Sequence, residues 1–142
     1  MALGSIFDIA GSGMNAQSVR LNTTASNLAN ADAASSSIDQ TYRGRHPVFA
    51  AINNDVLTFD TDKHSPSIGV QVLDVVESDA PLQPRYEPNH PLANTEGYVY
   101  YPNVNVVEEM TNMISASRSF QMNVEVMNSA KQMMQRVLSL GQ

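Results

Sequence analysis

The 142-residue chain contains no cysteine and no tryptophan, and only 15% of its residues are charged. The absence of cysteine excludes a disulfide scaffold, a thiolate zinc site, an iron–sulfur cluster and a cysteine nucleophile. It does not fix the compartment, because a chain without thiols can function in reducing or oxidising surroundings. An ordinary globular domain carries about a quarter charged residues, so this chain is poor in charge although its net charge is −6.

Basic charge and long apolar runs are also scarce. The chain has 8 Lys and Arg against 14 Asp and Glu, which argues against a nucleic-acid binder that neutralises phosphates. No run reaches the roughly 18 apolar residues of a membrane span, so we expect no direct membrane insertion. The N-terminus lacks a basic region, and Asp8 interrupts its apolar residues, so we expect no cleaved secretory signal.

Helical periodicity marks both ends of the chain. Apolar or small residues recur at spacings of three and four over residues 3–28, which predicts one amphipathic helix of about 45 Å. A stronger, heptad-like seam runs over residues 106–138. Asn103 or Asn105 is placed to cap the second helix, and Gly141 suits its end.

The middle of the chain has the chemistry of strands and turns. All seven prolines lie between residues 47 and 102, and residues 31–37 form a small, polar linker. Valines at positions 70, 72, 75 and 76 predict a strand with one buried face. Short strands are expected over residues 48–52, 56–59, 69–76, 85–87 and 98–101.

These patterns predict an α+β fold in which two long terminal helices pair as an antiparallel coiled coil around an inserted β-rich domain. The expected parts are an N-terminal helix (1–30), a β-rich insert with its linker (31–103) and a C-terminal helix (104–142). The two helical parts are each electrically neutral, so the middle carries the entire net charge of −6. The middle is therefore expected to face water.

The helices themselves have few charges on their surfaces. Residues 1–30 contain eleven Asn, Gln, Ser and Thr but only two charged residues, a surface that fits a crowded, hydrated helix assembly. Six of the eight methionines lie on the C-terminal helix, where flexible thioethers can pack against several partners. The alternative interpretation is that the methionines form an ordinary core between the two helices. Two paired helices, however, cover only one side of each other, so the opposite side of each helix has no partner within the chain.

We therefore predict an assembly interface from the apolar positions of both seams. Its residues are Met14, Leu21, Leu28, Val106, Met110, Met113, Phe120, Val124, Met127, Met134 and Leu138.

Catalytic and cofactor motifs are weak. Residues 11–16 match the dinucleotide pattern G-x-G-x-x-A, but no second strand ends at Asp32, as that fold requires. The three histidines, His46, His64 and His90, lie in the turn-rich middle without the spacing of a metal site. We expect no catalytic, cofactor-binding or metal-binding residues.

Two sequence blocks resemble a known family. Residues 10–22 (AGSGMNAQSVRLN), followed by 25–30 (ASNLAN), resemble the N-terminal signature of bacterial flagellar axial proteins of the rod and hook. Residues 97–110 (GYVYYPNVNVVEEM), with 116–120 and Asn123, are similar to the proximal rod members of this family in particular.

The resemblance implies a structural subunit of the flagellar basal body, without catalysis or cofactor, in the rod that crosses the periplasm. The terminal helices of such proteins form the inner tube around the export channel. The implied partners are further copies of the chain, the rod proteins FlgB, FlgF and FlgG, the rod adaptor FliE and the MS ring. Members are exported by the flagellar type III apparatus without a cleaved signal.

Two alternatives remain open from the residues alone. One is a soluble binding module, such as a secreted adaptor or a tail-like protein of a phage or injection device, which predicts a stable monomer or a small closed oligomer. The other is an enzyme, which requires a pocket that joins His46 or His90 to a carboxylate.

Overall fold

The computed structural model describes residues 3–52 and 69–141. The expected α+β class is confirmed, with a long helix at each end and antiparallel strands between them. The strand expected over residues 56–59 and His64 lie outside the described residues. In chain order the elements are α1 (Leu3–Ala29), the 3-10 helix η1 (Ile38–Gln40), β1 (Arg45–Ile52), β2 (Gly69–Glu77), β3 (Gln83–Tyr86), β4 (Tyr98–Tyr101) and α2 (Val106–Leu140).

Helix α2 begins at a defined cap. The side-chain oxygen of Asn105 accepts hydrogen bonds from the backbone N–H groups of Val107 (3.1 Å) and Glu108 (3.4 Å). Asn105, rather than Asn103, is therefore the N-cap residue, and it satisfies donors that have no partner within the helix. Gly141 follows the last helical residue, as expected.

The strands form two separate antiparallel hairpins. In the first, β1 pairs with β2 from Arg45 opposite Glu77 to Ile52 opposite Gly69, and the register shifts between Val48 and Phe49. In the second, β3 pairs with β4, and a bridge between Ser35 and Tyr100 ties the linker after α1 to this hairpin.

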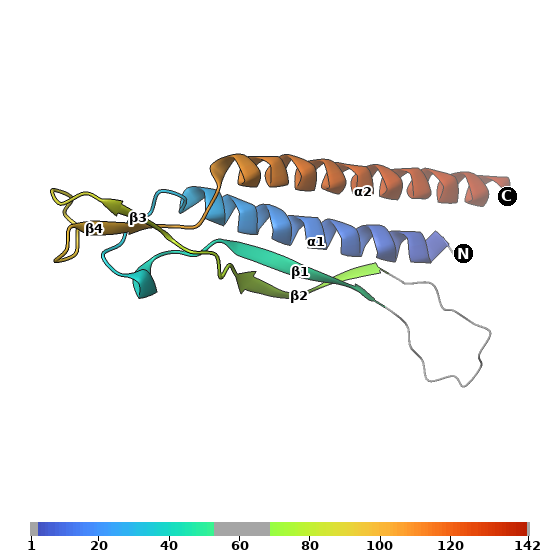
Figure 1. Cartoon of the computed structure of the whole chain (residues 1–142). Helices are drawn as coiled ribbons and strands as arrows, with labels where there is room; N and C mark the ends of the chain where they lie inside the picture. Colours follow the sequence, from blue (N-terminus) through green and yellow to red (C-terminus); the bar gives the residue numbers. More distant parts are fainter. Residues whose placement is uncertain (1–2, 53–68, 142) are drawn as a thin grey trace, which may run out of the picture.

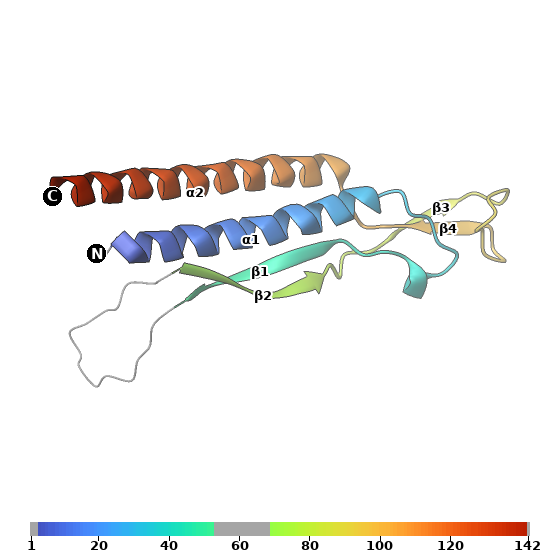
Figure 2. The same cartoon turned by 180° about the vertical axis from the view of Figure 1, so that it is seen from behind.

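The arrangement of these elements is elongated (Figure 1). Helices α1 and α2 lie side by side and run in opposite directions, and the β1–β2 hairpin lies along α1 on the side away from α2. The β3–β4 hairpin extends beyond the helices, at the end where α1 stops and α2 starts. Both termini lie at the opposite end, as the reverse view also shows (Figure 2).

The core is small for a chain of this length. Among the described residues, the buried apolar side chains are mostly alanines, and the largest fully buried side chains are those of Val99, Asn27 and Pro102. The chain exposes 10028 Å² of surface, whereas a compact monomer of 15.5 kDa exposes about 7,200 Å². Much surface that a compact domain would bury is therefore open to solvent.

The β1–β2 hairpin also leaves apolar side chains exposed to solvent. Val70, Val75 and Val76 are exposed and Val72 is half-buried, so the prediction of a strand with one buried face is wrong for three of the four valines. Among the described elements, the hairpin packs against α1 alone. A two-stranded hairpin needs a second packed layer to bury a face, and one helix covers only part of it.

Candidate functional site

Small residues bring the two long helices together. Ala10 and Ala16 of α1 and Ala116 and Ala130 of α2 are all at most 2% exposed. A Cβ atom added to Gly13 would lie 2.8 Å from the side-chain nitrogen of Asn123, so the helices approach closely at this level. At this level the contact depends on the missing side-chain volume of Gly13.

Polar side chains accompany these alanines across the helix contact. Arg20 of α1 donates a 3.0 Å hydrogen bond from Nη2 to the side-chain oxygen of Asn112 on α2. Thr23 and Thr24 are buried, and the Thr23 hydroxyl donates to the Val19 carbonyl within the helix. The side-chain oxygen of Gln17 is buried without a hydrogen-bond partner among the described residues. The buried side of α1 therefore carries amides and hydroxyls as well as alanines, and Arg20 and Asn112 link the two helices directly.

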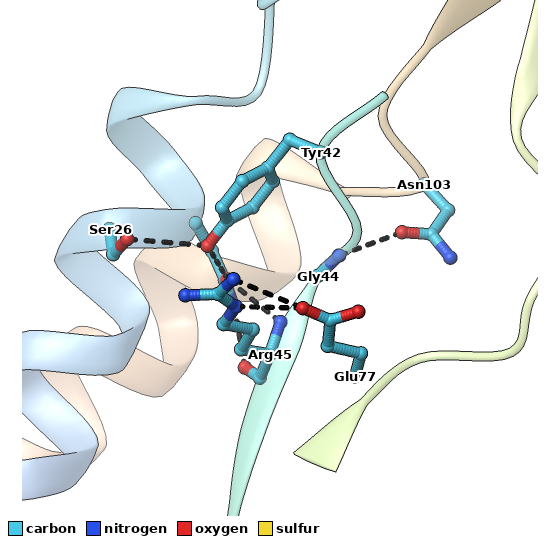
Figure 3. A network of polar contacts seen from close by, with 7 residues as sticks. Ser26, Tyr42, Gly44, Arg45, Glu77 and Asn103 are labelled. Atoms are coloured by element: carbon cyan, nitrogen blue, oxygen red, sulfur yellow. Dashed lines mark hydrogen bonds and ion pairs between the residues drawn. The ribbon is translucent and has the colours of Figure 1, made fainter. Parts of the chain in front are cut away.

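Asn27 joins the end of α1 to the start of the first hairpin. Its side chain is fully buried, and it donates from Nδ2 to the Arg45 carbonyl oxygen (2.8 Å) while Oδ1 accepts from the Arg45 N–H (2.9 Å). The same oxygen accepts from the Tyr42 hydroxyl (2.8 Å), which also contacts Ser26 (Figure 3). One amide thereby satisfies both backbone polar groups of Arg45, which the strand ladder leaves free.

Asn103, just before α2, makes the matching connection from the other side of the chain. Its side-chain oxygen accepts from the Gly44 N–H (2.8 Å; Figure 3), and its nitrogen donates to the carbonyls of Ser78 and Ala80. Arg43 donates to the same two carbonyls. We call Asn27, Tyr42, Arg43 and Asn103 the junction residues, because they connect the end of α1 and the segment before α2 to the start of β1 and the segment after β2.

An ion pair borders the junction. Arg45 contacts Glu77 at 3.0 Å across the paired ends of β1 and β2 (Figure 3). Both side chains are about half exposed, so solvent screens the pair and its contribution to stability is small. The amides of the buried Asn27 and the half-buried Asn103, not this ion pair, fix the geometry of the junction.

The eleven residues predicted to form the assembly interface fall into two groups. The structure leaves Val106, Met110 and Leu138 exposed. The other eight are half-buried: Met14, Leu21, Leu28, Met113, Phe120, Val124, Met127 and Met134.

Helix α2 carries nearly half of the exposed large apolar side chains among the described residues. Met110 is 52% exposed and Met122 is 64% exposed, although both are large apolar side chains. Exposed large apolar side chains gathered on one element mark a binding or assembly site in a soluble protein. The exposed large apolar residues of α2 are Val106, Val107, Met110, Ile114, Met122, Val126, Met133, Val137, Leu138 and Leu140.

The described residues offer no arrangement suited to chemistry. Gly11 and Gly13 lie inside α1, far from the strand-to-helix turn that a dinucleotide site needs. His90 accepts a hydrogen bond from the Leu92 N–H, and no hydrogen bond or ion pair within residues 3–52 and 69–141 joins His46 or His90 to a carboxylate. No group of three potential metal ligands occurs in the same part of the chain. Its helices are also too short or too polar to span a membrane.

Sequence reasoning missed the junction residues. Asn27 was one polar residue among many on the first helix, and Asn103 was a candidate cap. No local signal distinguishes them, because their partners lie 18 and 59 residues away in the chain. Only the approach of distant backbone segments gives these two amides their function.

Comparison with known proteins gives matches at both ends and over the whole length. The family described as "Flagella basal body rod protein" matches residues 7–34, and "Flagellar basal body rod FlgEFG protein C-terminal" matches residues 95–140. Proteins named flagellar basal-body rod protein FlgC are 51% identical in Escherichia coli O6:H1 and 45% identical in Yersinia enterocolitica, each over all of both chains. The FlgC protein of Borreliella burgdorferi is 36% identical over all of this chain and 99% of its own.

Proposed function

Because the chain belongs to the FlgC family of flagellar basal-body rod proteins and is a structural subunit of the rod rather than an enzyme, we propose that it builds the proximal part of a hollow, torque-transmitting shaft. It assembles there with other axial proteins of the rod. The exposed apolar surface of α2 carries this proposal, because an isolated subunit has nothing to bury it against.

The two helices form an antiparallel coiled coil that neighbouring subunits complete. Within the chain, the fully buried apolar residues of α1 and α2 are all alanines and the larger apolar side chains of the predicted interface are at most half-buried, so the pair alone buries limited apolar area. Neighbours that cover the exposed Val106, Met110 and Leu138 add the missing burial. The eight half-buried residues of the predicted interface lose their remaining exposure in the same step.

The three parts of the chain have different places in this assembly. The neutral helical parts, 1–30 and 104–142, face the axis of the shaft, where repeated identical charges would repel one another. The acidic insert, 31–103, lies outside. The helices thus carry few charges because neighbouring copies of the chain bury them.

The neighbours follow from the family. We propose further copies of the chain, the rod proteins FlgB, FlgF and FlgG, and the rod adaptor FliE with the MS ring at the base. The chain reaches the periplasmic rod through the flagellar type III export apparatus without a cleaved signal. Torque then passes through many repeated contacts, with no chemical step.

Isolation of basal bodies tests the proposal directly. Cells that lack the chain should be non-motile, and a tagged copy that restores swimming should co-purify with the rod and not with the soluble fraction. A tagged, motile strain whose basal bodies lack the chain would contradict the proposal. A stable monomer that binds one soluble partner would favour the binding-module alternative instead.

A further inference from the structure

Glu109 is a buried acid without a partner in the contact between the two long helices. The residue is 4% exposed, and its carboxylate makes neither a hydrogen bond nor an ion pair within the described part of the chain. A buried charge is costly unless an opposite charge or hydrogen bonds compensate it. The first turn of a helix favours acids, but Glu108 in the same turn is exposed, so this preference does not account for the burial of Glu109.

Arg20 of α1 lies about one helical turn from Glu109 and has unused hydrogen-bond donors. Its Nη2 atom donates to the side-chain oxygen of Asn112, which follows Glu109 by three residues on α2. Residues at this spacing are neighbours on a helix surface, with Cβ atoms about 5–6 Å apart. The other N–H groups of the guanidinium have no acceptor among the described residues. A change of side-chain rotamer therefore suffices to bring Arg20 to the Glu109 carboxylate.

A second acceptor without a donor lies on the other side of Arg20. The side-chain oxygen of Gln17 is buried and unpaired within residues 3–52 and 69–141, and Gln17 precedes Arg20 by three residues on α1. The bases of the junction are already engaged, since Arg45 pairs with Glu77 and Arg43 donates to two backbone carbonyls. Arg20 is therefore the cation available to this part of the helix contact.

We propose that Arg20 and Glu109 form an ion pair when neighbouring subunits cover the two helices. In the free chain Arg20 and Asn112 are half-buried, so water reaches the edge of the contact and solvates the guanidinium. Neighbours that exclude this water raise the cost of two separate charges and strengthen their attraction. The inference rests on the proposed function, because the assembly supplies these neighbours. The ion pair makes the closest contact of α1 with α2 depend on assembly.

Neutral variants test the ion pair in cells that carry each variant as the sole copy. Glu109→Gln and Arg20→Gln should each lower the recovery of the chain in basal bodies about tenfold, because each leaves the other charge buried alone. The double variant should also lose about tenfold, and not about a hundredfold, since both changes remove one interaction. In urea, Glu109→Gln should raise the unfolding equilibrium constant of the free chain by no more than about threefold, because no ion pair is lost there.

Two further variants are the matched controls. Glu108→Gln removes the exposed acid of the same helical turn, and its recovery in basal bodies should stay within about twofold of the parent. Arg20→Lys keeps the positive charge and loses the planar fork. It should be recovered at least about threefold better than Arg20→Gln, because a charged group still faces Glu109.

The outcomes separate the ion pair from the proposed function. A loss of about a hundredfold in the double variant, a loss of about tenfold in Glu108→Gln, or equal losses in Arg20→Lys and Arg20→Gln would overturn the pairing. If Glu109→Gln destabilised the free chain as strongly as it lowered recovery, the pair would be closed before assembly and the link to assembly would be wrong. Absence of the parent chain from basal bodies would overturn the proposed function, whereas full recovery of Glu109→Gln beside the parent would overturn only the ion pair.

Discussion

At the scale of single residues, the junction shows how a few amides position whole elements. Asn27 makes three hydrogen bonds from a fully buried side chain, two of them to the backbone of Arg45. Asn103 makes three more on the other side of the junction. Since a buried polar group is costly when unpaired, the buried Asn27 in particular fixes how the start of the first hairpin is attached to α1.

Replacing the amide of Asn27 should therefore destabilise the chain strongly. Asn27→Ala leaves the N–H and C=O of Arg45 without partners, and we expect the free energy of unfolding to fall by about 3 kcal/mol. Tyr42→Phe removes one hydrogen bond to the Asn27 oxygen and the longer contact with Ser26 but leaves Arg45 paired, and it should cost about 1 kcal/mol. Urea unfolding followed by circular dichroism measures both. Similar small losses in both variants would show that Asn27 does not organise the junction.

At the scale of elements, the contact between α1 and α2 depends on residues without bulk. Gly11 and Gly13 are two positions apart on α1, yet a Cβ at Gly11 meets nothing within 4 Å, whereas one at Gly13 lies 2.8 Å from the Asn123 side chain. The close approach is therefore local to one face of the helix. A helix that needs glycine for packing accepts its unfavourable propensity at that position.

The two glycines form a matched pair for a packing test. Gly13→Val should lower the free energy of unfolding by about 2 kcal/mol, because the added methyl groups push α2 away from α1. Gly11→Val should change it by less than about 0.5 kcal/mol, because valine and glycine differ little in helix propensity and space is open. Thermal unfolding of both variants provides the comparison. A loss at Gly11 as large as that at Gly13 would contradict the assigned helix contact.

At the scale of the whole molecule, the chain is an elongated subunit with too little core for its surface. Its large apolar side chains are mostly on the outside of α2 and of the β1–β2 hairpin. Association that covers them adds apolar burial and raises the stability of the folded state by mass action. Folding and assembly are thus linked in the proposed rod.

Two methionines separate assembly from folding. Met110 is 52% exposed and Met113 is half-buried. Met110→Asp should leave the unfolding free energy of the free chain within about 0.5 kcal/mol but lower its recovery in basal bodies roughly tenfold, because an unpaired charge is then buried between subunits. Met113→Asp should lower both quantities. If the Met110→Asp strain swam normally, Met110 would not be part of the interface between subunits.

Hydrogen exchange tests the link between folding and assembly. In the dilute free chain we expect weak protection of both long helices, since few large side chains hold them together. In isolated rods the same amides should exchange at least about a hundredfold more slowly than in the free chain. Strong protection of α1 and α2 in the dilute monomer would contradict the coupling.

Much of this protein follows from local sequence. Periodicity located both helices, short runs of β-branched and aromatic residues in the proline-rich middle located strands between them, and Gly141 marked the end of α2. These features depend on residues within a few turns of one another, so the chain itself specifies them. The family resemblance of residues 10–22 and 97–110 was confirmed by the full-length relatives.

The tertiary structure decided which residues matter inside these elements. The predicted strand face with Val70, Val75 and Val76 remained exposed, because periodicity shows that a face is apolar but not whether another element covers it. The junction amides, Asn27 and Asn103, likewise gained their roles only when distant backbone groups reached them. The sequence alone determined the helices, their low charge and the family. The spatial approach of α1, α2 and the hairpin decided where the small core lies and which apolar surface is left for neighbours.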